Sequence, residues 1–260
     1  MSFSSLHGTC TAIVGPNGAG KTTLLKILGG AIQRYKGRVS VNGRVSLSPE
    51  ISVNFPYMDA VENVRYFSKI IGSKQDPFTI LMELNLVPKG QLAYTFSKGM
   101  KRKLDVARAL SLSAGVILMD EPFDGLDPGA SRDLALTVNS LKSHGVTFII
   151  SSHDLLRLNE IADLVIFLKQ GMIAGLREMD SRSALIVKID GDLTPAVNIL
   201  NEMRCRITST ENNEVHFEPA AGIAEWDVLG GLIKGGIKVT GLSGETLDSN
   251  YRRIFLGNLD

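Results

Sequence analysis

The 260-residue sequence has few cysteines and no excess of charge of either sign. Its two cysteines, Cys10 and Cys205, lie far apart and form no metal-binding spacing, which is typical of a protein from a reducing compartment. The formal net charge is +1, so the composition gives no general attraction to nucleic acid or to anionic lipid. We therefore expect no nucleic acid among its partners.

Long apolar runs are missing as well. A membrane helix needs about 20 consecutive apolar residues, whereas the most apolar stretches here, 146–150 and 164–168, have only the length of strands. Residues 1–6 lack the basic and apolar segments of a secretion signal. With 44% hydrophobic residues the chain can bury a core. We expect a protein that is soluble or is held at a membrane by a partner.

The most informative feature that is present is a glycine-rich loop between a predicted strand, 9–14, and a predicted helix, 22–28. Strand, loop and helix are the context in which the pattern G-x-x-x-x-G-K-[ST] holds the phosphates of a nucleotide. The residues predicted to bind the nucleotide are Gly15, Pro16, Asn17, Gly18, Ala19, Gly20, Lys21, Thr22 and Thr23.

The chemistry of this loop follows from its residue types. Glycine permits a positive φ and close approach of the backbone, and the N–H groups at the start of the helix form a nest for anions. Lys21 is expected to reach the β- and γ-phosphates, and the Thr22 hydroxyl to bind Mg²⁺. The loop by itself does not distinguish a kinase, a GTPase and an ATPase.

Polar residues follow two further apolar runs, 116–119 and 147–150. Ligands of parallel sheets lie at the carboxyl ends of the strands. We therefore expect Asp120 to face the Mg²⁺ held by Thr22, and Glu121 to polarise an attacking water. His153 follows the second run on the same side, where a ring nitrogen would contact a γ-phosphate.

A third segment, 96–104, begins a predicted helix. Ser97 and Gly99 lie at its N-terminus, where a hydroxyl and a small residue can bind an anion. Taken alone, an ordinary serine N-cap explains the same residues. The basic run 98–103 is compatible with RNA, but on a helix such a run is more often a solvated face.

The order of elements predicts an α/β fold with a mostly parallel sheet over residues 1–180. Residues 59–110 are helical in pattern and form a helical insertion between sheet elements. Asp127 and Pro128 begin the helix that links the strands on either side. After about residue 180, the order β-α-β-β-α-β predicts a small ferredoxin-like α+β domain over 181–260, with a polar turn at 211–213.

Together these motifs resemble the ATPase subunits of ABC transporters. The resemblance covers roughly residues 1–175 and lies in the order of the motifs: the phosphate loop, a signature at 97–101, the Asp120-Glu121 pair, a D-loop at 125–127 and a switch histidine, His153. It implies a P-loop NTPase fold. The Ser-Lys-Gly-Met form of the signature looks like the subgroup that serves export-type permeases, whose tail often resembles the segment Thr246–Tyr251.

The resemblance also implies a mechanism. Two such subunits, identical or paired, meet head to tail and enclose two ATP molecules. Each ATP lies on the loop of one subunit and against Ser97 and Gly99 of the other. Glu121 would act as general base, His153 would hold the γ-phosphate, and Asp127 would couple the two sites. A separate membrane permease would place the protein at the cytoplasmic face of the membrane, which it would contact only through that permease.

Three departures from the family pattern bear on function. Only fourteen residues precede Gly15, so we do not expect the earlier strand and the adenine-stacking aromatic residue that the family normally has, and Phe3 is too near the loop to be the obvious equivalent. We therefore expect ATP affinity to be lower by about tenfold or more. Glu50 stands where the family's Mg²⁺-binding glutamine is expected. The stretch 21–50 is short, so antiparallel strands there are expected to be trimmed.

Two alternatives stay open beside the transporter. The first is a soluble ABC ATPase that acts on ribosomes or DNA, although such proteins usually carry two cassettes or a long insertion. The second is a regulatory subunit that does not hydrolyse ATP. The presence of Lys21, Asp120, Glu121 and His153 argues against the second alternative.

Overall fold

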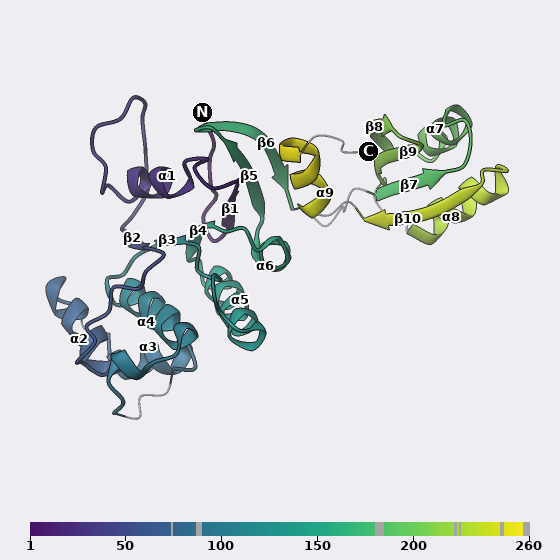
Figure 1. Cartoon of the computed structure of the whole chain (residues 1–260). Coiled ribbons are helices and arrows are strands. Elements are labelled where there is room, and N and C mark those ends of the chain that lie inside the picture. Colours follow the sequence, from purple (N-terminus) through teal and green to yellow (C-terminus); the bar gives the residue numbers. More distant parts are fainter. Residues whose placement is uncertain are drawn as a thin grey trace. The chain divides into compact units, whose positions relative to one another are not determined.

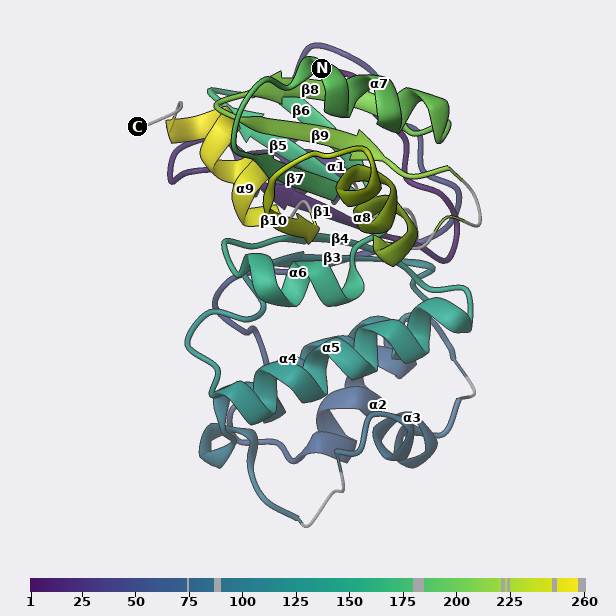
Figure 2. The same cartoon turned by 90° about the vertical axis from the view of Figure 1, so that its right-hand side faces the viewer.

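The computed structural model describes residues 1–73, 75–86, 90–179, 185–220, 223, 225–244 and 247–256. The chain divides into two compact units, one formed by Met1–Glu178 with Ile254–Asp260 and the other by Met179–Arg253. Figures 1 and 2 show both in two orthogonal views. The predicted boundary at 180/181 lies outside the described residues.

The first unit contains a six-stranded sheet with helices on both faces (Figure 1). The sheet order is β2-β3-β4-β1-β5-β6, and all neighbours are parallel except β5 and β6. Its elements are β1 Cys10–Val14, α1 Lys21–Leu28, β2 Val45–Ser48, α2 Ala60–Ile70, α3 Pro77–Glu83, η1 Ala93–Thr95, α4 Lys98–Ser111, β3 Val116–Asp120, α5 Pro128–Ser143, β4 Thr147–Ser151, α6 Leu155–Ile161, β5 Leu164–Lys169 and β6 Met172–Glu178.

The central strands explain why the site forms where it does. β1, β3 and β4 are almost continuously apolar and buried, as expected of parallel strands covered on both faces. Because the three run in the same direction, the loops after Val14, Asp120 and Ser151 meet at one edge of the sheet. The predicted α/β class with a mostly parallel sheet is confirmed.

The helices α2, α3 and α4 pack against one another and form the helical insertion (Figures 1 and 2). α2 begins with a capping box, in which Asp59 accepts from the Glu62 N–H and Glu62 accepts from the Asp59 N–H. The N-cap of α4 is Ser97. α4 therefore leads from the insertion back to the sheet, where it also packs against β2 and α5.

The second unit has the predicted β-α-β-β-α-β order. Its antiparallel sheet runs β10-β7-β9-β8, and Asn212 and Asn213, both with positive φ, form the predicted turn between β8 and β9. The elements are β7 Leu185–Ile189, α7 Thr194–Glu202, β8 Arg206–Glu211, β9 Glu214–Glu218, α8 Glu225–Lys234 and β10 Val239–Gly244.

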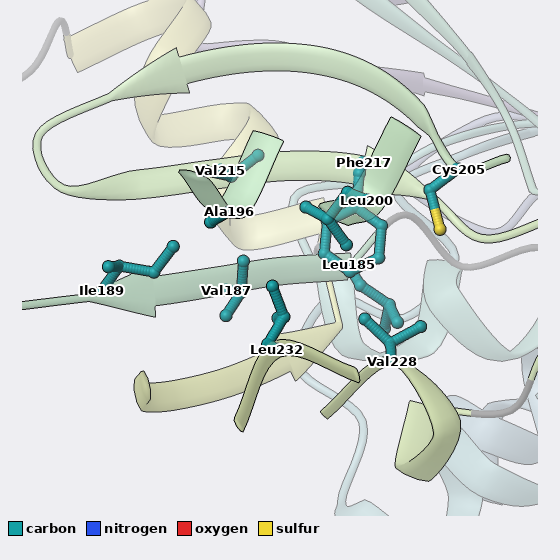
Figure 3. Close-up of a cluster of buried hydrophobic side chains, with 10 residues drawn as sticks. All are labelled: Leu185, Val187, Ile189, Ala196, Leu200, Cys205, Val215, Phe217, Val228 and Leu232. Atoms are coloured by element: carbon teal, nitrogen blue, oxygen red, sulfur yellow. The ribbon is translucent and has the colours of Figure 1, made fainter. Parts of the chain in front are cut away.

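A buried apolar cluster holds this unit together (Figure 3). Alternate residues of β7 and β9 supply one side of the cluster, and α7 and α8 supply the other, which is the arrangement expected when helices cover one face of a sheet. The cluster consists of Leu185, Val187, Ile189, Ala196, Leu200, Cys205, Val215, Phe217, Val228 and Leu232.

Several elements differ from the sequence predictions. The strands β2 and β6 and the helix α6 were not anticipated. The predicted final helix over 245–255 consists instead of α9 Leu247–Tyr251 followed by the π-helical turn η2 Arg252–Leu256. In η2, Phe255 contacts Phe167 of β5, with ring centroids 6.2 Å apart. Of the tail segment 246–251, residue Thr246 lies outside the described residues.

No helix among the described residues is both long enough and apolar enough to cross a membrane.

The buried thiol of Cys10 yields a first prediction. Burial raises its pKa to about 12, so the thiol stays protonated at neutral pH and is shielded from reagents. In a Cys205→Ser variant, we expect Ellman's reagent at pH 8 to label Cys10 only as fast as the protein unfolds. Immediate labelling in 6 M guanidinium chloride serves as the control. Rapid labelling of the native variant would contradict this burial.

Candidate nucleotide site

The phosphate loop has the geometry that its sequence predicts. Gly18 and Gly20 have φ values of 78° and 103°, in the region that favours glycine. The Ala19 N–H donates to the Pro16 carbonyl at 3.1 Å, which closes the turn before α1. The backbone N–H groups of the phosphate loop therefore gather where α1 begins.

Gly15 packs directly on the backbone of β5. A Cβ at this position would collide with the Leu168 carbonyl oxygen, a backbone atom that cannot move aside. We expect Gly15→Ala to lower the free energy of unfolding by about 1–3 kcal/mol, measured by urea denaturation. Gly115→Ala is the matched control, because a Cβ there meets no atom within 4 Å. Equal stability of both variants would refute the close contact.

Lys21 is buried at the start of α1, with 8% of its surface exposed. Its Nζ donates to the Gly15 carbonyl at 2.8 Å and lies 3.4 Å from Oε1 of Glu121. The ammonium group is therefore held over the loop, between backbone oxygens and one carboxylate. This is the position from which it can exchange these partners for phosphate oxygens.

Glu121 connects the three strand ends. Its side chain is 14% exposed and joins Lys21 on one side and His153 on the other. Oε2 lies 2.9 Å from His153 Nδ1 and accepts from the His153 N–H at 3.1 Å. The His153 ring is 67% exposed and so is open to a ligand. Sequence reasoning placed Glu121 and His153 at strand ends and Lys21 in the phosphate loop, and the structure brings the three into one network.

The backbone of Glu121 is held in an uncommon conformation, with a φ of 44°. Its N–H donates to both the carbonyl and the hydroxyl oxygen of Ser151, each at 3.0 Å. Ser151 in turn donates its hydroxyl to the buried Asp120 carboxylate at 2.5 Å. β4 thus holds the carboxylate of Asp120 and the backbone of Glu121.

The residues predicted to bind Mg²⁺ offer only oxygen atoms, which is the donor set that this ion prefers. Thr22 and Glu50 are exposed, whereas Asp120 is buried. The register of β2 and β3 pairs Ser48 with Met119. Glu50 lies two residues after Ser48, as Glu121 lies two residues after Met119, so both stand at the same edge of the sheet. The chemistry and placement of these residues fit the ion.

The signature residues lie at the N-terminus of α4, next to the D-loop. The Ser97 hydroxyl accepts from the Met100 N–H at 3.2 Å, so the ordinary N-cap is present. Gly99 packs on α5, where a Cβ would stand 2.9 Å from the Ala130 Cβ.

The Lys98 ammonium donates to the Asp124 carbonyl at 3.3 Å. Asp127 caps α5 by accepting from the Ala130 N–H. Within the described residues, no hydrogen bond joins Ser97 or Gly99 to the chain's own phosphate loop.

The interpretation of the basic run 98–103 as a solvated face is wrong for two of its residues. Arg102 and Lys103 are each 6% exposed. Lys103 pairs with Asp133 of α5, and Arg102 binds the segment after β2. α4 lies between β2 and α5, so these side chains point into packed structure and find partners there.

Sequence reasoning missed the charged row formed by Arg102, Asp105 and Arg108. Burial lowers the pKa of the Arg102 guanidinium and raises the pKa of the Asp105 carboxyl, and the opposite charges between them counter both shifts. The sequence does contain a signal for this row, because Asp105 is three residues from each arginine on one helix. Helical spacing alone, however, does not distinguish a buried row from an exposed one.

Fold and loop geometry together define a P-loop NTPase: a mostly parallel sheet with the phosphate loop between its first strand and helix. A family model described as ABC transporter matches residues 1–124. A lantibiotic transport ATP-binding protein of Streptococcus pyogenes is 33% identical over 191 residues, covering 68% of this chain and 82% of that protein. The chain belongs to the family of ABC transporter ATP-binding proteins.

Two further likenesses agree with this assignment. A fluoroquinolones export ATP-binding protein of Mycobacterium tuberculosis is 30% identical over 190 residues, covering 68% of this chain and 63% of that protein. The solved structure of an ATP binding subunit of an ABC transporter superposes with a TM-score of 0.59 at 28% identity, covering 68% of this chain and 82% of that one.

Proposed function

We propose that this protein hydrolyses ATP and powers export through a separate membrane permease. The observation that carries the proposal is the network of Lys21, at the start of α1, with Glu121 and His153, which follow the neighbouring strands β3 and β4. A cation for the phosphates, a carboxylate for the attacking water and a ring for the γ-phosphate are the groups that phosphoryl transfer to water requires. Mg²⁺, when bound, would neutralise charge that develops on the phosphates.

The proposed roles follow from the contacts. Lys21 would leave Glu121 and bind the β- and γ-phosphates, with the loop N–H groups around them. Glu121 would then accept a proton from the attacking water, and His153 would hold the γ-phosphate from the exposed side. Thr22, Asp120 and Glu50 would hold the metal ion. Charge neutralisation and positioning supply most of the rate enhancement in this class of reaction.

We further propose that a complete site needs a second subunit, either an identical copy or a paired ATPase. In support, Ser97 is exposed, and the Lys98–Asp124 contact keeps the D-loop beside the signature. The two segments thus form one surface that a partner's nucleotide can meet. Residues 1–180 would form the ATPase domain and residues 181–260 an accessory domain.

Export is the finer part of the proposal, and it rests on relatives named for lantibiotic transport and fluoroquinolones export. The proposed partner is a permease, and the proposed location is the cytoplasmic face of the membrane. Affinity purification of the tagged chain from detergent-solubilised membranes tests both. Recovery of a polytopic membrane protein is expected. Recovery of RNA or ribosomal proteins without one would favour the soluble ATPase instead.

A further inference from the structure

Helix α4 presents a row of buried charges to the segment that follows β2. Arg102, Asp105 and Arg108 are 6%, 1% and 7% exposed. Asp105 lies between the two arginines, at 3.7 Å from each, and accepts from the Ser48 hydroxyl at 3.2 Å. Buried charges are expensive unless they are paired and hydrogen-bonded. Each of the three buried charges is therefore expected to have specific partners.

Those partners differ between the two arginines. The Arg102 guanidinium donates to the Pro49 carbonyl at 2.7 Å, to the Glu50 carbonyl and to the Glu121 carbonyl at 3.4 Å. Arg108 donates to the Val53 carbonyl and stacks over the Phe67 ring at 5.2 Å. Of the two arginines, Arg102 therefore is the one that joins α4 to the backbones that follow both β2 and β3.

The contact with Glu121 falls on a strained residue. A side-chain-bearing residue with positive φ persists only where its surroundings hold it. Ser151 holds the Glu121 N–H from the side of β4, and Arg102 holds its carbonyl from the side of α4. The Asp124 N–H also donates to the Glu121 carbonyl, at 3.2 Å, so Arg102 adds to this local turn a contact that comes from α4.

We propose that Arg102 is a positioning residue that ties the signature helix α4 to the backbones of Glu50 and Glu121. A displacement of α4 would thereby turn the Glu121 carboxylate away from the attacking water. A planar guanidinium with five N–H donors suits a site with three carbonyls, whereas a lysine ammonium lacks that fixed fork. The effect on catalysis rests on the proposed function, whereas the connection between α4 and the backbones of Glu50 and Glu121 does not.

Arg102→Met and its matched control Arg108→Met test this inference by kinetics. Both remove one buried charge from the same helix and leave Asp105 one arginine. We expect Arg102→Met to lower the kcat for ATP about ten- to a hundredfold with KM changed less than about threefold, because misplacing a reacting group by an ångström has effects of that size. Arg108→Met is expected to keep kcat within about threefold. Equal losses of kcat in both variants would assign the effect to helix stability and overturn the inference.

Hydrogen–deuterium exchange tests the link without hydrolysis. In Arg102→Met, the amides of residues 50–53, 121 and 123–126 are expected to exchange about tenfold faster, since hydrogen bonds from a charged donor are lost. Residues 15–22 should stay unchanged. If the parent protein does not hydrolyse ATP, the proposed function fails, and this exchange result alone decides the link. Parental exchange in both segments would refute it.

Arg102→Lys is a second variant that tests the inference even if Arg102→Met does not fold. Lysine keeps a charge beside Asp105 but cannot reach three carbonyls in fixed geometry. We expect a folded protein with faster exchange in both segments and a reduced kcat. Parental kcat together with parental exchange in this variant would show that a charge alone suffices and would overturn the role given to the guanidinium.

Discussion

Replacing Lys21 with alanine is expected to abolish Mg²⁺-dependent ATP hydrolysis, with kcat/KM reduced by about a thousandfold or more. The change removes the buried cation that is aimed at the phosphates. It also leaves the Glu121 carboxylate 14% exposed and without its 3.4 Å partner. The Glu121 carboxylate would keep its contact with His153 but would face the phosphates without the Lys21 cation, so the lost attraction and the remaining negative charge both act against ATP binding. Release of inorganic phosphate, followed with and without Mg²⁺, measures the loss.

The matched control for this prediction is Lys26→Ala. Lys26 is exposed on the same helix α1 and contacts none of the site residues described here. Its removal should leave kcat and KM within about twofold of the parent values, because isolated surface charges contribute little. If Lys21→Ala retained substantial ATPase activity, the loop would not be the hydrolytic site, and the proposed function would be lost with it.

Much of the site could be predicted because each of the strands that precede its residues can be identified in the sequence from its own apolar run. The runs before Gly15, Glu121 and His153 are apolar and of strand length, and parallel strands bring their carboxyl ends to one edge. The placement of Asp120, Glu121 and His153 on the side of the phosphate loop followed from that rule. What the rule could not give was the 2.9 Å contact between Glu121 and His153, which depends on side-chain conformations.

The missed elements have a common physical reason. β2 is four residues long and carries two serines, so its apolar signal is weak, and it forms because Val45–Ser48 pairs with the buried strand β3. β6 alternates at the sheet edge and pairs antiparallel with β5. Tertiary pairing decides both strands, whereas local propensity does not.

The charged row of α4 was missed for a similar reason. A run such as 98–103 is compatible with an exposed face until the partners of each residue are known. The partners of Arg102 and Lys103, which are the carbonyls after β2 and the Asp133 carboxylate, lie at distant positions in the sequence. A long cationic side chain can be buried wherever such oxygens converge, which no periodicity reveals.

Glu121→Gln should separate nucleotide binding from hydrolysis. Glutamine keeps the shape of the side chain and can still accept from the His153 N–H, but it cannot take a proton from water. We expect kcat to fall about a hundred- to ten-thousandfold, the usual contribution of a general base. ATP binding should persist or strengthen, because Lys21 loses a competing carboxylate at 3.4 Å. Single-turnover hydrolysis and nucleotide binding by calorimetry measure the two effects.

The same variant tests the second subunit. If hydrolysis opens a closed pair of subunits, a protein that binds ATP but does not cleave it should accumulate as a dimer in size-exclusion chromatography with ATP and Mg²⁺. Glu160→Gln is the matched control, since the partner of the Glu160 carboxylate within the described residues is Arg157 on the same helix α6, and it should behave as the parent. Hydrolysis by Glu121→Gln at the parent rate would disprove the role of Glu121 as base, whereas slow hydrolysis without a dimer would leave that role intact and remove the composite site.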